Sequence, residues 1–164
     1  MKSQTAFGRF QGAVEQPWFS FGYTALRVLL GLQFFFAGVE KMGDWSAASY
    51  LENATGPFAT LFQSLAGNAL VDALNVWGLL LIGLALILGF LVRPASLFAA
   101  MMMFLYYVAQ FEQNTAHGFI DEHIIYIAIF LMFLAGGAGH TFGLNSLAEQ
   151  YFSRQKRLAS ILFG

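Results

Sequence analysis

The stretch LVDALNVWGLLLIGLALILGFLV (residues 70–92) is followed, after Arg93-Pro94, by ASLFAAMMMFLYYVAQF (residues 95–111). A helix that crosses a membrane needs roughly 20 consecutive, mostly apolar residues, with a range of about 17–25. Both runs meet this requirement. Because proline disfavours helical conformation in the residue before it, Arg93-Pro94 predicts a tight turn between two spans.

Two further runs of the same character flank this pair, at about residues 21–41 and about residues 119–139. Hydrophobic residues make up 58% of the chain and charged residues only 10%. Soluble domains usually carry about 25% charged residues. The sequence therefore predicts an all-α integral membrane protein, a four-helix bundle in the lipid bilayer with short amphipathic surface helices.

Lysine and arginine residues outside the four spans fall mainly on one side of the membrane. They are Lys2, Arg9, Arg93, Arg154, Lys156 and Arg157. Because cytoplasmic loops carry an excess of basic residues, we expect both termini to be cytoplasmic. The expected organisation is a cytoplasmic segment at residues 1–20, a four-span domain at 21–145 with an outer loop at 42–69, and an amphipathic cytoplasmic helix at 146–164.

The outer loop is too apolar to be free in water. Its large apolar residues predict two short helices, broken at Gly56-Pro57, that lie like a lid on the outer surface. The C-terminal helix mixes apolar and basic residues, which is typical of an anchor on anionic lipid. Docking on a partner subunit is the alternative for that helix.

The fourth span places three titratable residues beside an apolar run. Residues 124–139 number only 16, or about 24 Å of helix, which is shorter than the roughly 30 Å hydrocarbon core. We therefore expect the helix to extend upstream through Asp121, Glu122 and His123. Two interpretations stay open: these residues are solvated at the interface, or they have a functional or buried-pair role.

The first span carries a stripe of residues at alternating spacings of four and three: Arg27, Gly31, Phe34, Gly38 and Lys41. Such residues share one helix face. Glycines on the stripe allow another helix to approach closely in lipid, so we expect a structural role for Gly31 and Gly38. Arg27 is also a structural candidate, which either snorkels to the cytoplasmic end or finds a partner inside the bundle.

Polar residues gather in the outer third of the expected bundle, whereas the rest is almost purely apolar. The set is Glu40, Lys41, Asp72, Asn75, Tyr107, Gln110, Glu122, His123 and Tyr126. A polar pocket at one membrane face, lined by aromatic residues, suits an amphipathic lipid-soluble ligand such as a quinone. An ion site, or a network that only holds the helices in register, are the alternatives.

Candidate roles follow from side-chain chemistry. Glu122 and His123 are candidate catalytic residues, because carboxylate and imidazole groups exchange protons with a ligand or with water. The candidate ligand-binding residues are Lys41, Asp72, Asn75, Trp77, Tyr107 and Tyr126. Trp77 also suits an interfacial aromatic belt.

Several classes of function find no support in the sequence. The chain has no cysteine and a formal charge of −1, which gives no basis for disulfides, thiolate sites or a nucleic-acid partner. No haem, flavin or phosphate-loop pattern is evident. His117 and His123, with nearby carboxylates, match no standard metal spacing, so no metal site is assigned.

The chain resembles the DoxX/DoxD family of small four-span membrane proteins over roughly residues 20–145. The resemblance rests on the first-span stripe, on GPF (residues 56–58), on NVWGLLLIGLALILGFLVRPA (residues 75–95) and on IDEHIIYIAIFLMFLAGGAGHTFGLN (residues 120–145). Where the family usually has an arginine after GAG and an aspartate after GL, this chain has His140 and Asn145.

The resemblance implies a four-helix bundle engaged in membrane redox work in the prokaryotic plasma membrane. Members similar to DoxD are the large subunit of a thiosulfate:quinone oxidoreductase. It implies a quinone-binding subunit that is not active alone and that works with other membrane or periplasmic redox subunits or as a homo-oligomer. A structural or assembly subunit is the alternative, and a small transporter or channel is the third possibility.

Overall fold

The computed structural model of the chain describes residues 17–116, 118–136, 138 and 143–144. The helices are α2 (Pro17–Val39), α3 (Ala48–Glu52), α4 (Ala59–Ser64), α5 (Ala69–Leu88), α6 (Val92–Ala109), α7 (Phe111–Asn114) and α8 (Glu122–Gly136). Within these ranges the only β-type pairings are isolated bridges. Most of the segment expected at residues 1–20, and the amphipathic helix expected at 146–164, lie outside the described residues.

The predicted all-α membrane bundle is confirmed. Helices α2, α5 and α6 are each long and apolar enough to cross a membrane. Helix α8 is equally apolar in character but has only 15 residues, so it extends about 22 Å. The fourth expected span is therefore present as a shorter helix than the other three.

The turn between α5 and α6 is not at Arg93-Pro94, and that prediction was wrong. Gly89 ends α5 with φ 64°, and Leu91 precedes α6 with φ 53°. Pro94 lies in the first turn of α6, where its missing N–H removes no helix hydrogen bond. Glycine reaches the left-handed conformation without strain, so the chain reverses three residues earlier than expected.

The upstream extension of the fourth span also stops earlier than expected. Helix α8 begins at Glu122, and the Ile124 N–H donates to Asp121 Oδ1 over 3.1 Å. Asp121 therefore occupies the capping position, where a side-chain oxygen satisfies a first-turn N–H and the helix starts. Glu122 and His123 are helical, whereas Asp121 precedes the helix.

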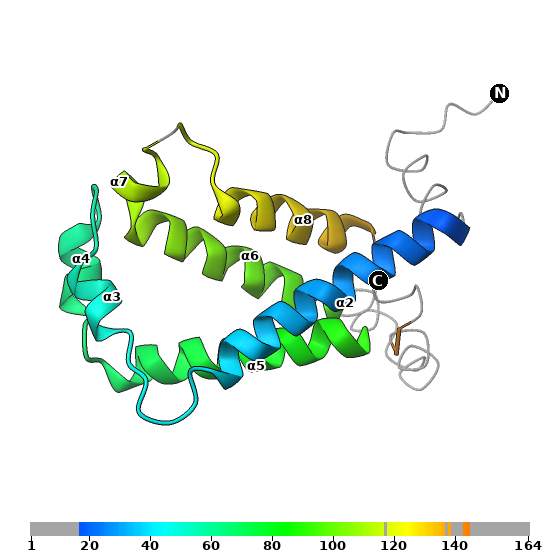
Figure 1. The fold of residues 1–164 in the computed structure, drawn as a ribbon, viewed down its shortest axis with the longest axis horizontal. Coiled ribbons are helices and arrows are strands. Elements are labelled where there is room, and N and C mark those ends of the chain that lie inside the picture. Colours follow the sequence, from blue (N-terminus) through cyan, green and yellow to red (C-terminus); the bar gives the residue numbers. More distant parts are fainter. Residues whose placement is uncertain (1–16, 117, 137, 139–142, 145–164) are drawn as a thin grey trace, which may run out of the picture.

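The long helices form two pairs, α2 with α5 and α6 with α8, and α5 also contacts α6. Figure 1 shows α3, α4 and α7 gathered at one end of these helices, which we call the lid end. The two short helices expected in residues 42–69 are α3 and α4, with Gly56-Pro57 between them. They bury a small apolar cluster that includes Leu51, Phe62 and Ala109.

Aromatic side chains join α2 to α8 across the middle of the bundle. The Phe34 ring lies 5.2 Å from the Phe130 ring and 6.3 Å from the Tyr126 ring, both edge to face. The Tyr23 hydroxyl donates to the Met132 carbonyl over 2.8 Å. Large rings therefore fill the space between these two helices.

Glycines set the distance between α2 and α5. A Cβ atom on Gly83 would lie 2.5 Å from the Phe35 nitrogen and 2.7 Å from the Gly31 oxygen. One on Gly38 would lie 2.9 Å from the Leu80 nitrogen. Because these contacts are with backbone atoms, no side chain can be added there unless a helix moves.

Arg27 lies inside the bundle rather than at its surface. Its side chain is only 1% exposed, and its guanidinium donates to the Ala138 carbonyl beyond the end of α8. A Cβ atom on Gly89 would lie 2.7 Å from Arg27 Nη1. The guanidinium is thus held where α5 and α8 end, and the C-terminal ends of helices favour a positive charge.

The close contact at Gly83 predicts that alanine destabilises the protein at this position but not at a glycine without neighbours. We expect Gly83→Ala to lower the free energy of unfolding by about 1–3 kcal/mol, the usual cost of overpacking. Gly22→Ala is the control, because a Cβ atom there would meet nothing within 4 Å. Reversible unfolding in mixed detergent–SDS micelles, followed by circular dichroism, measures both. Equal effects of the two substitutions would contradict the close approach of α2 and α5.

Candidate functional site

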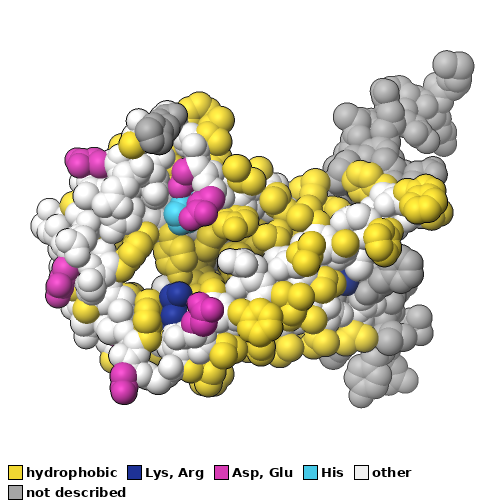
Figure 2. Space-filling view, viewed as in Figure 1, with side chains coloured by type: hydrophobic (Ala, Val, Ile, Leu, Met, Phe, Trp, Pro, Cys, Tyr) yellow, Lys and Arg dark blue, Asp and Glu magenta, His cyan; other side chains and the backbone are white. Residues whose placement is uncertain are grey.

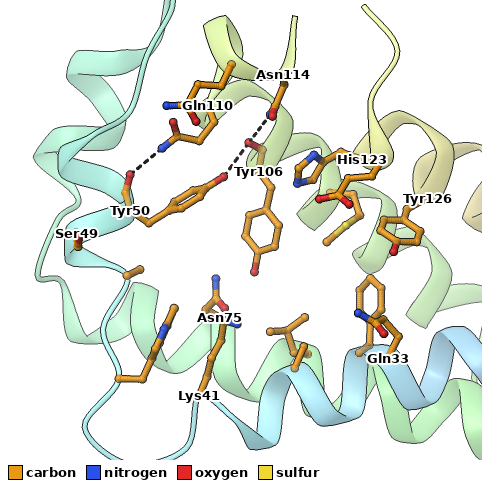
Figure 3. A pocket seen from close by; sticks show the side chains of 18 of the residues that line it. Gln33, Lys41, Ser49, Tyr50, Asn75, Tyr106, Gln110, Asn114, His123 and Tyr126 are labelled. Carbon is orange, nitrogen blue, oxygen red and sulfur yellow. Dashed lines mark hydrogen bonds between the residues drawn. The ribbon is translucent and has the colours of Figure 1, made fainter. Parts of the chain in front are cut away.

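A cavity of about 730 Å³ lies at the lid end. Its walls come from the lid-end parts of α2, α5, α6 and α8, from α7, and from residues 45–50 before and within α3. Figure 3 shows the polar side chains of these elements converging on the same space. The volume falls within the roughly 300–1,000 Å³ range of small-molecule sites.

Five of the residues predicted for the site line this cavity. They are Lys41, Asn75, Glu122, His123 and Tyr126. They come from three segments that are far apart in the sequence, namely the residues after α2, α5 and α8, so the fold brings them together. Gln110, which belongs to the predicted outer polar set, also lines the cavity.

Three residues predicted to bind the ligand do not line the cavity. Asp72 Oδ1 accepts the Ala47 N–H over 2.8 Å, so it anchors the segment before α3. The Tyr107 hydroxyl donates to the Phe119 carbonyl over 3.0 Å. Trp77 is 58% exposed on α5, where it is available to lipid.

Three buried polar atoms in the cavity wall have no hydrogen-bond partner within the described part of the chain. They are Asn75 Oδ1, the Tyr106 hydroxyl and Gln110 Oε1. The Asn75 amide is close enough to influence the Tyr106 hydroxyl, yet no hydrogen bond of normal geometry joins the two. Buried polar groups are nearly always paired, so this cluster is ready to bind a polar ligand or water.

His123 and Asp121 form a pair at the edge of the cavity. His123 Nδ1 lies 2.5 Å from Asp121 Oδ2, and the two side chains are 16% and 15% exposed. The His123 ring packs edge to face on the Tyr106 ring at 6.1 Å. A carboxylate bonded to Nδ1 fixes the proton there in the neutral ring and leaves Nε2 for other partners.

Charge in the cavity wall is mixed. Lys41 Nζ lies 5.3 Å from the centre of the Trp45 ring, which is within the range of a cation–π contact. Glu122 lines the cavity but is largely exposed. Among the described residues, histidine and carboxylate side chains form no group of three or more that could hold a metal ion.

Hydrogen bonds hold the lid, by which we mean α3, α4 and the residues around them, against α6. The Gln110 Nε2 donates to the Tyr50 carbonyl over 3.1 Å, and the Tyr50 hydroxyl donates to the Tyr106 carbonyl over 3.2 Å (Figure 3). Burial, with a smaller effect of the Asp121 charge, raises the pKa of Tyr50 to about 12. The Tyr50 hydroxyl therefore stays protonated, and remains a donor, at neutral pH.

Tyr106 and Tyr50 are wall residues that the predicted ligand set missed. Tyr106 is one position from Tyr107, and both follow the buried Met103 at helical spacing, so periodicity alone does not separate them. Tyr50 lies in the loop that was predicted only to cover the site. Gln33, also missed, gives a clear signal as the one amide within an apolar helix.

The fold and the cavity define a small multi-pass helical membrane protein with a polar cavity at one end of its bundle. A family model described as DoxX matches residues 22–111, more than half of the chain, so the chain belongs to the DoxX family. The match runs from α2 to the first residue of α7, and α8 lies beyond it. No curated protein and no solved structure matches the chain in the same comparisons.

The Asp72 contact predicts a local effect on the lid. We expect Asp72→Ala to increase amide hydrogen exchange around residues 45–56, because it leaves the Ala47 N–H without its acceptor, at a cost of about 1–3 kcal/mol. Asp72→Asn keeps an acceptor oxygen and is the matched control. Exchange measured by mass spectrometry in nanodiscs decides the point. An unchanged exchange rate in Asp72→Ala would mean that the lid is held by other contacts.

Proposed function

We propose that this DoxX-family protein is a membrane subunit of a quinone-linked oxidoreductase or respiratory complex, with the quinone ring bound in the lid-end cavity. The observation that carries the proposal is a group of three buried polar atoms, on Asn75, Tyr106 and Gln110, that line one cavity and have no hydrogen-bond partner in the described part of the chain. A buried polar atom without a partner costs about 1–3 kcal/mol. A bound polar head would remove that cost.

The wall chemistry fits a quinone ring. Ring carbonyls need donors, which the Tyr106 hydroxyl and the Asn75 amide provide, and ring hydroxyls need acceptors, which Asn75 Oδ1 and Gln110 Oε1 provide. Leu79, Met103 and Phe34 supply apolar surface for the ring. A bound quinone supplies reversible two-electron, two-proton chemistry.

The protonic part of that chemistry falls to residues of this chain. His123 is within the cavity wall, and the Asp121 carboxylate bonded to its Nδ1 keeps Nε2 free to exchange a proton with the bound head. Both side chains keep some contact with solvent, so protons can pass on to water. Glu122, largely exposed at the cavity edge, is the second proton-exchanging group.

The proposed setting is the prokaryotic plasma membrane, with both termini cytoplasmic and the lid end at the outer face. In this proposal, electrons would come from other membrane or periplasmic redox subunits. A second candidate function is a structural or assembly subunit. It is favoured by Asp72 and Tyr107, two polar residues of the lid end that hold loops rather than line the cavity.

Substitutions in the wall separate the two functions. We expect Asn75→Leu and Tyr106→Phe each to reduce the quinone retained per chain about tenfold, the effect of losing one hydrogen bond of about 1.4 kcal/mol. Trp77→Phe is the control, because Trp77 faces away from the cavity. Quinone extracted from protein purified in mild detergent is quantified by chromatography. Normal retention in both wall variants, together with a lower yield of assembled complex, would support the assembly function instead.

The His123–Asp121 pair predicts a defined tautomer. We expect the neutral His123 ring to carry its proton on Nδ1, and Asp121→Ser to shift it towards Nε2, since serine still caps α8 but is too short to hold the ring. Asp121→Asn retains an acceptor oxygen and should keep the Nδ1 tautomer. Nitrogen-15 NMR of histidine-labelled protein, with His117 and His140 replaced by glutamine, reads the tautomer directly. The same tautomer in all three proteins would show that Asp121 does not position the ring.

A further inference from the structure

The lid-end cavity opens at the side of the bundle rather than at its end. The long helices run across the view in Figure 1, so a hollow that faces the viewer lies on the flank of the bundle. Figure 2, from the same side, shows such a hollow near the lid end, with charged side chains around it and apolar side chains within it. Its position matches the cavity wall contributed by α2 and α8.

The end of the bundle, in contrast, is covered. The Thr55 N–H donates to the Ala109 carbonyl over 2.9 Å, and the Glu112 N–H donates to the Thr55 hydroxyl over 3.1 Å. With the Gln110–Tyr50 bond, these contacts fix α3 and α7 across the lid end. An opening on the flank of a membrane-spanning bundle faces the bilayer (Figure 2).

Gln33 and Tyr126 stand on the two sides of this opening. Figure 3 shows them on α2 and α8, on opposite sides of the same end of the cavity, and both line it. Gln33 lies six residues before the end of α2, or about 9 Å along the helix, and it is exposed. A polar side chain at that depth is costly in lipid and usually faces a cavity or a pathway.

We infer that the cavity takes a one-headed amphiphile from the side, through the gap between α2 and α8, and that the ligand's apolar chain stays in this gap with Gln33 at its edge. This inference rests on the proposed function for the identity of the head. Exposed apolar side chains lie on the same helices, among them Phe36, three residues after Gln33 on α2, and Ile125, three residues after Glu122 on α8. At that spacing they neighbour the cavity-lining residues and provide a surface for the chain. The ligand class is therefore a tailed quinone rather than a water-soluble one.

A bulky residue at the entrance tests the route. Trp45, which lines the cavity, serves as the fluorescent reporter. The chain has three tryptophans, so replacing Trp18 and Trp77 with phenylalanine makes Trp45 the single one that remains. Quenching of Trp45 fluorescence in nanodiscs then reports the arrival of a quinone. The probes are a decyl-tailed benzoquinone and the same ring without a tail.

We expect Gln33→Phe to slow quenching by the decyl-tailed quinone about tenfold, within the range by which single changes alter association rates. The tail-less ring should be affected much less. Leu81→Phe, an exposed position on α5 outside the cavity, should change neither. If each probe quenches Gln33→Phe at the same rate as the parent protein, the side entrance is wrong. Quinone binding itself would still stand, because quenching by the quinone would still occur.

A second measurement does not depend on quinone. Phospholipids with brominated acyl chains quench a tryptophan that they contact, so they should quench Trp45 in the parent protein and do so less in Gln33→Phe. If no quinone reaches Trp45 but this lipid effect is present, the proposed function fails and the side opening stands. If Gln33→Phe does not change the lipid quenching, the side opening fails as well.

Discussion

The close approach of α2 and α5 at Gly31, Gly38 and Gly83 is the contact on which the rest of the bundle depends. Lipid gives apolar helices no reason to associate with one another rather than with acyl chains, so packing of small residues has to hold them. Glycines let α2 and α5 touch through their backbones, whereas α2 contacts α8 through large side chains. The rings of Phe34, Phe130 and Tyr126 fill the space between α2 and α8.

The cavity is a direct result of this two-pair arrangement. Towards the lid end, polar and aromatic side chains of α5, α6 and α8 line the space without filling it. Three of their polar atoms have no hydrogen-bond partner among the described residues. The lid then covers the space, held by backbone and amide hydrogen bonds to α6.

Hydropathy and helical periodicity predicted the membrane bundle, its long helices and the glycine face, because these depend on properties that a single helix carries. The turn was misplaced because Pro94 is acceptable both in a turn and in the first turn of a helix, whereas the left-handed conformation of Gly89 decides where the chain reverses. Asp121 was placed inside α8 because residue type alone does not separate a capping carboxylate from a helical one.

Part of the candidate site could be predicted from properties of single helices, and part could not. Asn75, His123 and Tyr126 were expected at the outer polar cluster because they are polar or aromatic residues near the same end of their helices, and they line the cavity. Asp72 and Tyr107 share those features, yet their partners are the backbone of Ala47 and Phe119, in loops whose paths the sequence does not give. The position of Tyr50 at the cavity likewise depends on the path of the outer loop, residues 42–69.

The unequal lengths of α2 and α8 have a consequence for the bilayer itself. Helix α2 has 23 residues and α8 has 15, or about 34 Å and 22 Å of helix. A short apolar helix is accommodated by local thinning of the membrane. The thin region then lies beside the opening between α2 and α8 and brings water and head groups closer to His123. The acyl-chain length of the host membrane thereby becomes a variable that acts on the site without touching any of its residues.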